Sequence, residues 1–128
     1  MDYDTYVNRA HEAARLDEAG DVAGALKIFE ALIDSDLATV DRSLMCCNAG
    51  ALLEKLGRAN DALQALDHGV ALEVPLCRSY VAEHKAAMLH RLGRNGEALA
   101  LYRVLLGRSW ASEQEKQRFR HNIAALGG

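Results

Sequence analysis

The chain has 128 residues, half of them hydrophobic, with ten glycines and a single proline. It is therefore too apolar for a disordered protein and too poor in proline for a linker, and its length suits one domain. The formal net charge of −3 gives no general attraction to nucleic acid, so we expect no nucleic-acid partner. No apolar stretch approaches the roughly 18 residues that span a bilayer, and we expect no membrane partner.

Charge is distributed unevenly along the chain. Residues 1–41 carry ten acidic and three basic side chains, a net charge of −7, whereas residues 42–128 carry eight acidic and twelve basic side chains, a net charge of +4. The first interpretation is that these charges lie on solvated helix faces of differing sign. The alternative is that one end of the protein attracts a basic partner or the opposite end of another copy.

The first predicted helix covers residues 4–19 and ends at Gly20, a residue type that tolerates the left-handed backbone of a helix C-cap. The second predicted helix covers residues 22–34, where apolar side chains three and four positions apart form one broad stripe. The two helices together form a candidate hairpin with an apolar face that must pack against a neighbour.

This hairpin is the first of three similar units. A glycine followed five residues later by Ala-Leu occurs at Gly20, Gly57 and Gly93, so the spacing is 37 and then 36 residues. A fixed period of this length is typical of stacked helical hairpins. We expect Pro75 in the first turn of the helix that opens the third unit, where its missing N–H needs no partner. The units align without gaps over residues 6–36, 43–73 and 79–109.

Residues 112–126 are predicted to form a seventh helix. Ser112 and Glu115 have the spacing of a capping box at its start. The helix has a single apolar stripe and is otherwise polar, as expected of a helix that caps the core of the last hairpin. The sequence therefore predicts an all-α protein, a right-handed α-solenoid of three antiparallel helix hairpins plus a seventh capping helix, in one domain of residues 1–128.

The three units resemble the tetratricopeptide repeat (TPR) family over roughly residues 6–110. The resemblance depends on a small and an apolar residue in each first helix, and on a small and a large residue in each second helix. In that order, the residues are Ala13, Gly50 and Ala86; Leu16, Leu53 and Leu89; Ala25, Ala62 and Ala98; and Phe29, Leu66 and Tyr102. Small residues let paired helices approach closely, and the large residue fills the crevice between them. The units depart from the family at its early tryptophan, which is replaced by Arg9, Cys46 and Ala82.

The resemblance implies that the first helices line a concave groove that binds a protein or peptide. Small side chains would form a shallow apolar floor, and Asp17, Glu54 and Glu83 would accept hydrogen bonds from the partner. Such a groove favours a neutral or basic segment, and we therefore expect a protein–protein interaction adaptor. The expected lining residues are Val7, Ala10, Ala14, Asp17, Leu44, Cys47, Asn48, Ala51, Glu54, Tyr80, Glu83, His84, Ala87 and His90.

One subgroup of the family holds the C-terminal carboxylate of chaperone tails with lysine, arginine and asparagine side chains. Only Asn48 matches that pattern here. The other four positions are occupied by Ala10, Ala14, Tyr80 and His84. The positive charge that would hold a carboxylate is therefore missing, which disfavours a chaperone-tail receptor.

Two other hypotheses stay open. One is homo-oligomerisation through the charged ends or an exposed apolar surface. The other is a metal or thiol site in which Cys47 joins His84 or His90, although these histidines are six residues apart and do not share a helix face. No catalytic or cofactor motif is present, so we expect neither an enzyme nor a cofactor. Three cysteines without CxxC spacing and an acidic N-terminus without an apolar run lead us to expect a cytoplasmic protein.

Overall fold

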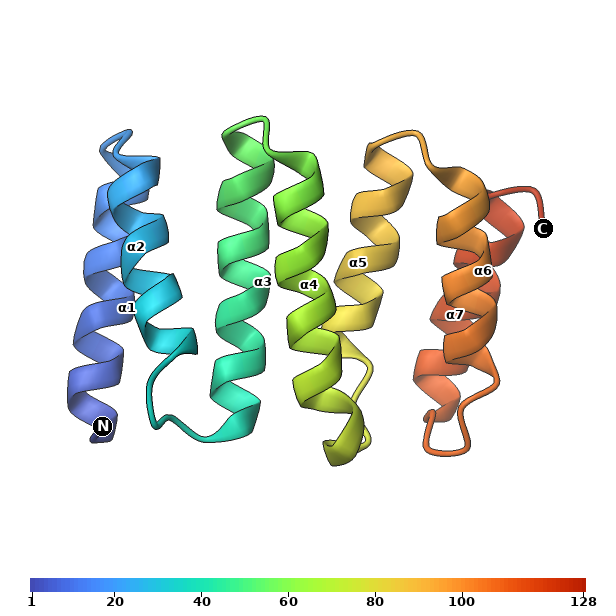
Figure 1. The fold of residues 1–128 in the computed structure, drawn as a ribbon. Coiled ribbons are helices and arrows are strands. Elements are labelled where there is room, and N and C mark those ends of the chain that lie inside the picture. Colours follow the sequence, from blue (N-terminus) through green and yellow to red (C-terminus); the bar gives the residue numbers. More distant parts are fainter.

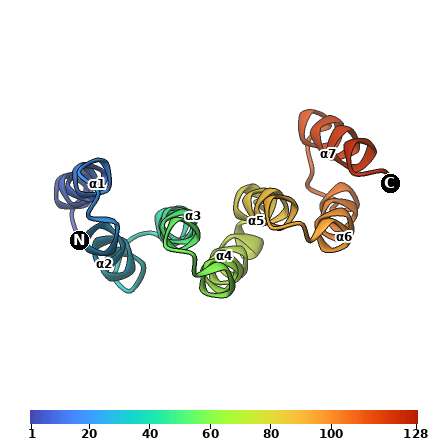
Figure 2. The same ribbon diagram turned by 90° about the horizontal axis from the view of Figure 1, so that it is seen from above.

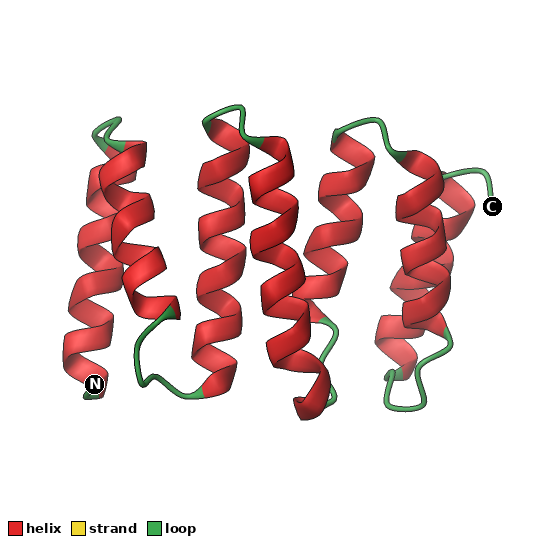
Figure 3. Ribbon diagram, in the orientation of Figure 1, coloured by secondary structure: helices red, strands yellow, loops and turns green.

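The computed structural model describes residues 1–128 and contains helices but no strands (Figures 1 and 3). The all-α fold expected from the sequence is confirmed. None of the helices is both long enough and apolar enough to pass through a bilayer. The elements are α1 (Tyr3–Glu18), α2 (Val22–Ile33), α3 (Thr39–Lys55), α4 (Ala59–Glu73), the short 3₁₀ helix η1 (Val74–Leu76), α5 (Tyr80–Arg91), α6 (Asn95–Leu106) and α7 (Glu113–Ala125).

The helices are arranged in two rows. Seen from above, α1, α3, α5 and α7 lie along one side of the array, and α2, α4 and α6 lie along the other (Figure 2). The array bends toward the row that holds α1, α3, α5 and α7, so this inner row occupies the concave side and the outer row occupies the convex side. The first helix of every hairpin therefore faces the concave side, and α7 stands at the end of the same row.

The turn inside each hairpin is made by a glycine with a left-handed backbone. Gly20, Gly57 and Gly93 have φ angles of +90°, +75° and +77°, which side chains with a Cβ rarely adopt. After α1, the N–H of Asp21 donates to the carbonyl of Leu16 at 2.8 Å, closing the helix end with the bond expected of a Schellman motif. This turn chemistry, predicted from the sequence, reverses the chain and places the second helix beside the first.

Pro75 lies in a different element from the one expected. It does not open α5 but belongs to η1, which continues directly from α4, and α5 begins only at Tyr80. Between them Cys77 adopts a left-handed conformation with φ of 55°, the only non-glycine residue with a positive φ. The proline does occupy a first helical turn, where it needs no N–H partner, but that turn belongs to the connection between two hairpins.

Close approach between helices depends on residues with little or no side chain. A Cβ atom built on Gly50 would lie 3.0 Å from Cδ2 of Leu66 on the neighbouring helix α4. On α4, a Cβ atom on Gly69 would lie 2.8 Å from both Cβ of Cys46 and Cγ1 of Val81. The alanines at the expected contact positions have no exposed surface: Ala13, Ala25, Ala62, Ala86 and Ala98. The helices thus pack at distances that larger residues would not permit.

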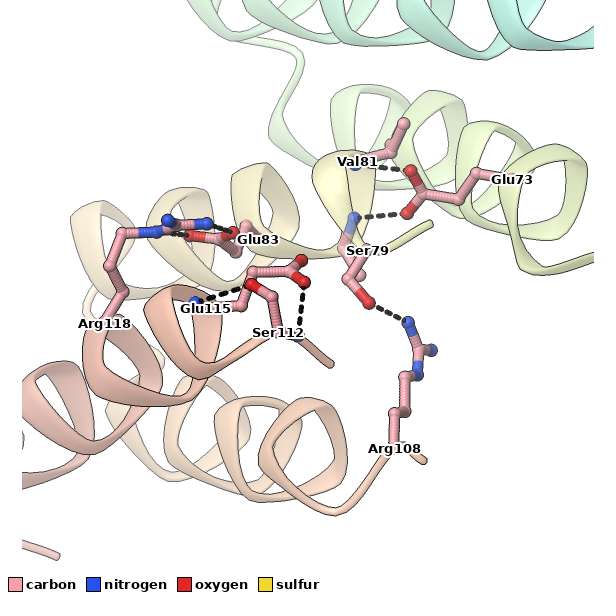
Figure 4. Close-up of polar contacts among 9 residues, drawn as sticks. Glu73, Ser79, Val81, Glu83, Arg108, Ser112, Glu115 and Arg118 are labelled. Carbon is pink, nitrogen blue, oxygen red and sulfur yellow. Dashed lines mark hydrogen bonds and ion pairs between the residues drawn. The ribbon is translucent and has the colours of Figure 1, made fainter. Parts of the chain in front are cut away.

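The carboxylate of Glu73 is buried at the junction between the second and third hairpins. Its two oxygens accept the backbone N–H groups of Val81 and Ala82 at 2.8 and 3.0 Å, in the first turn of α5 (Figure 4). Burial raises the pKa of Glu73 above its ordinary value, against the opposing effect of these two N–H donors and of Arg108 and Arg78. Glu73 thereby caps α5 from the end of α4, because Ser79 at the N-cap position makes no side-chain cap bond.

The tight contact at Gly69 predicts opposite effects for two glycine substitutions. Gly69→Ala should lower the free energy of unfolding by about 1–3 kcal/mol, because its new methyl group overlaps Cys46 and Val81. Gly96→Ala in α6 should raise that free energy by about 0.5–1 kcal/mol, because nothing lies within 4 Å and alanine favours the helix. Urea denaturation followed by circular dichroism measures both changes, and equal effects of the two substitutions would contradict the packing described for α4.

Removal of the buried cap predicts a large loss of stability. Glu73→Ala should lower the free energy of unfolding by about 2–4 kcal/mol, because two buried N–H groups lose their acceptor. Glu73→Gln retains one carbonyl acceptor and should lose less. Glu97→Ala is the matched control, since Glu97 is an exposed acid that pairs only with Arg94 on the same hairpin. An unchanged urea midpoint in Glu73→Ala would show that the carboxylate does not cap α5.

Candidate binding groove

The residues expected to line the groove all lie on helices of the inner row. Every one of the fourteen is at least partly exposed, and none belongs to the buried core. Ala14, Asn48 and Ala51 are exposed, and so are Tyr80 and His84. The neighbouring helix α7 does not cover them, because it occupies a fourth place along the inner row (Figure 2). The concave side is therefore an accessible surface.

On α1 and α3, the expected groove residues other than Asp17, Asn48 and Glu54 are small or apolar. On α1, Val7 and Ala10 are half-buried and Ala14 is exposed, and on α3, Leu44 and Cys47 are half-buried. Side chains of this size leave room above the backbone, and most of them have no group that forms strong hydrogen bonds. These side chains can contact apolar side chains of a partner but offer few polar contacts.

The three acidic residues of the groove already have partners within the chain. Asp17 on α1 pairs with Lys55 on α3 at 2.9 Å, and Glu54 on α3 pairs with Arg91 on α5 at 2.9 Å. A third pair joins Glu83 on α5 to Arg118 on α7 at 2.8 Å (Figure 4). Each pair links two neighbouring helices of the inner row, and we call the three pairs the ion-pair ladder. Their acceptor oxygens are engaged, so the ladder leaves this part of the groove with balanced charge.

Two aromatic rings lie side by side at the N-terminal end of α5. The rings of Tyr80 and His84 are 4.6 Å apart between centroids, with an angle of 55° between their planes, and Tyr80 is 47% exposed. An exposed ring with a hydroxyl group can cover apolar atoms and also bond to a polar group. On α3, the amide of Asn48 donates only to the sulfur of Met45, at 3.8 Å. Asn48, Tyr80 and His84 therefore keep hydrogen-bonding capacity for a partner.

Helix α7 was not among the elements expected to line the groove. Its polar side chains were expected to face solvent, and they do: five of them are at least partly exposed and border an open hollow of about 510 Å³. They are Gln114, Gln117, Arg118, His121 and Asn122. Their spacing of three and four residues places them on one helix face. The spacing could be read from the sequence and predicts a shared polar face, but the sequence did not show that α7 lies in the inner row.

The two neighbouring thiols on α3, Cys46 and Cys47, are expected to react slowly. Burial raises the pKa of Cys46 to about 11 and that of Cys47 to about 12, so both thiols are protonated at neutral pH. Cys77 is the exposed cysteine of the three. No group of three or more histidine, cysteine or acidic side chains comes together in a way that could hold a metal ion.

No protein-family model matches the chain, and no curated protein matches its sequence. Solved structures do match. PcrH from Pseudomonas aeruginosa is 22% identical over 100% of this chain and 96% of that chain, with a TM-score of 0.69. The same protein in complex with the chaperone binding region of PopD is 24% identical over 99% and 94% of the two chains, with a TM-score of 0.68.

A further match is SycD, a type III secretion chaperone of Yersinia enterocolitica, in complex with a peptide of the translocator YopD. It is 20% identical over 98% of this chain and 95% of that chain, with a TM-score of 0.68. The chain described here therefore shares the helical-repeat fold of these chaperones along nearly its whole length.

The pKa values of the thiols predict selective labelling. At pH 8 a thiol with a pKa of about 11 is ionised in roughly one molecule in a thousand, and the thiolate is the nucleophile. Iodoacetamide should therefore modify Cys77 first, and mass spectrometry should find a single adduct before Cys46 or Cys47 reacts. In urea all three should react, which provides the control. Labelling of Cys47 at the rate of Cys77 in the folded protein would instead indicate an activated thiol in the groove.

Proposed function

We propose that this protein is an adaptor that binds an extended segment of another protein in the groove of α1, α3, α5 and α7. The observation that carries this proposal is the set of small and apolar side chains on α1 and α3 that stay partly or largely exposed: Val7, Ala10, Ala14, Leu44, Cys47 and Ala51. In a folded domain such positions usually pack against another element. A bound segment would supply that contact, and helical arrays offer this kind of extended concave surface.

The ion-pair ladder bears on which net charge the partner segment should carry. Free carboxylates at Asp17, Glu54 and Glu83 would favour a basic segment, but each has a lysine or arginine partner. A basic residue of the partner would have to compete with these pairs. We therefore propose a neutral segment whose apolar side chains contact α1 and α3, with affinity that changes little between low and high salt.

The comparisons support the same class of function. SycD and PcrH share this fold, and their structures contain a peptide of YopD and the chaperone binding region of PopD. We propose a related task, the binding of a segment of a client protein, for this chain. We expect this to occur in a reducing compartment such as the cytoplasm, since all three cysteines are free thiols.

Self-association is the second hypothesis, and it has weaker support. For this hypothesis, we expected the acidic first hairpin of one copy to attract the basic C-terminal part of another copy. Asp17 is paired with Lys55, however, and Asp36 is paired with the N-terminal amino group. Part of the charge asymmetry is thus neutralised within one chain. Light scattering at low and high salt measures any remaining tendency to associate.

A steric block in the groove tests the proposed function. Peptides selected from a random display library on the wild-type protein should be neutral and rich in aliphatic residues. Ala51→Arg, which places a long charged side chain on the exposed concave face of α3, should weaken their binding by at least tenfold, measured by fluorescence anisotropy. The control is Ala71→Arg, at an exposed alanine of α4 in the outer row, which should leave binding unchanged. Equal binding by both variants would exclude the groove.

A further inference from the structure

The third hairpin departs from the other two at two positions that meet in space. The acid at the end of the first helix, Asp17 in the first unit and Glu54 in the second, is replaced by His90. The large residue of the second helix, which is Phe29 and then Leu66, is replaced by Tyr102. Two polar replacements thus occur at the interface with α7, where the earlier units have an ion pair and an apolar contact.

Both replacements line one cavity of about 100 Å³ where α5, α6 and α7 meet. Its walls are His90, Tyr102, Asn122, Ala125 and Leu126. Tyr102 is 6% exposed, and its hydroxyl group, which has no partner within the protein, is not fully buried but stays accessible from the cavity. An accessible hydroxyl without a protein partner can bond to water or to a ligand group that enters the cavity. The cavity has room for about three water molecules or one small side chain.

The polar groups around the cavity provide both donors and acceptors. Burial raises the pKa of Tyr102, so its hydroxyl stays protonated and can donate. Nδ1 of His90 lies 2.8 Å from Oδ1 of Asn95, and with that oxygen as acceptor the neutral ring keeps Nε2 as an acceptor. The side-chain amide of Asn122 has no partner within the protein and can both donate and accept.

This combination selects among chemical groups. The cavity walls contain no charged side chain, and the two charged groups that act on Tyr102, Glu83 and Arg91, oppose one another, so neither a carboxylate nor an ammonium group finds a dedicated counter-charge. A carboxamide is neutral and has an acceptor oxygen and a donor N–H₂ group, which match the protein groups in number and kind. Its short apolar stem would contact Ala125 and Leu126.

We propose that this cavity, the carboxamide pocket, binds an asparagine or glutamine side chain of the segment held in the groove. The inference rests on the proposed function, because His90 lies on the groove and Asn122 lines both the α7 hollow and the pocket. The pocket lies at the C-terminal end of the array, beyond the small and apolar groove residues of α1 and α3. The bound segment would therefore place its apolar residues over α1 and α3 and its amide residue beside α7, which defines its direction along the groove.

Small probes test the pocket without any partner. Propionamide should shift backbone amide NMR resonances around Tyr102 and Asn122, with millimolar affinity as expected for so few atoms. Isosteric propionate and propylamine should bind at least fivefold more weakly. Tyr102→Phe should weaken propionamide at least fivefold without lowering the melting temperature, since the hydroxyl has no partner within the protein. Ala125→Leu should fill the pocket and abolish binding, whereas Ala124→Leu, at an equally exposed alanine that does not line the pocket, should not.

A second experiment, with peptides, tests whether the pocket and the groove bind the same segment. Peptides selected on the wild type should carry asparagine or glutamine at a fixed distance from their apolar residues. Changing that asparagine or glutamine to alanine should lower the affinity of the peptide for the wild type at least fivefold but should not lower its affinity for Tyr102→Phe. The proposal is overturned if propionamide does not bind, if either charged probe binds as tightly, or if Tyr102→Phe binds propionamide unchanged. Ala51→Arg should retain propionamide while losing peptides, so a failure of the groove and a failure of the pocket give different results.

Discussion

The structure depends on the close approach of helices at positions that carry almost no side chain. Gly50 and Gly69 admit neighbouring side chains to within about 3 Å of where a Cβ atom would lie, and the repeated alanines are completely buried. Packing at this distance fixes how one hairpin sits on the next, because protein interiors tolerate little change in volume. The curvature of the array, and therefore the width of the groove, follows from these contacts.

The sequence was sufficient for the fold because the information was repeated. Gly20, Gly57 and Gly93 marked the turns, and apolar residues at helical spacing marked the faces that are buried. Pro75 was placed in the wrong element, since its ring is equally suited to the 3₁₀ turn that follows α4. A local preference for a first turn does not say which helix the turn belongs to.

The site was less predictable than the fold. Exposure of the inner row follows from helical periodicity, but the ion-pair ladder joins side chains 35–38 residues apart, and their meeting depends on how the hairpins stack. Glu54 and Arg91 look like unrelated surface charges in the sequence. The role of α7 was hidden for the same reason, because a polar helix face carries no sign of which way it will point.

The ladder also gives the array a direction. In every pair the acid belongs to the earlier helix and the base to the later one, as in Asp17 with Lys55. The middle hairpin carries both halves of the connection at the C-terminal end of α3, Lys55 toward the preceding unit and Glu54 toward the following one. The third unit instead has His90 at the position of Glu54 and pairs with α7 through Glu83, which lies earlier in the helix. Duplication of the middle hairpin would accordingly regenerate matched ends and lengthen the array, while duplication of the third would leave an arginine facing a histidine at the new joint.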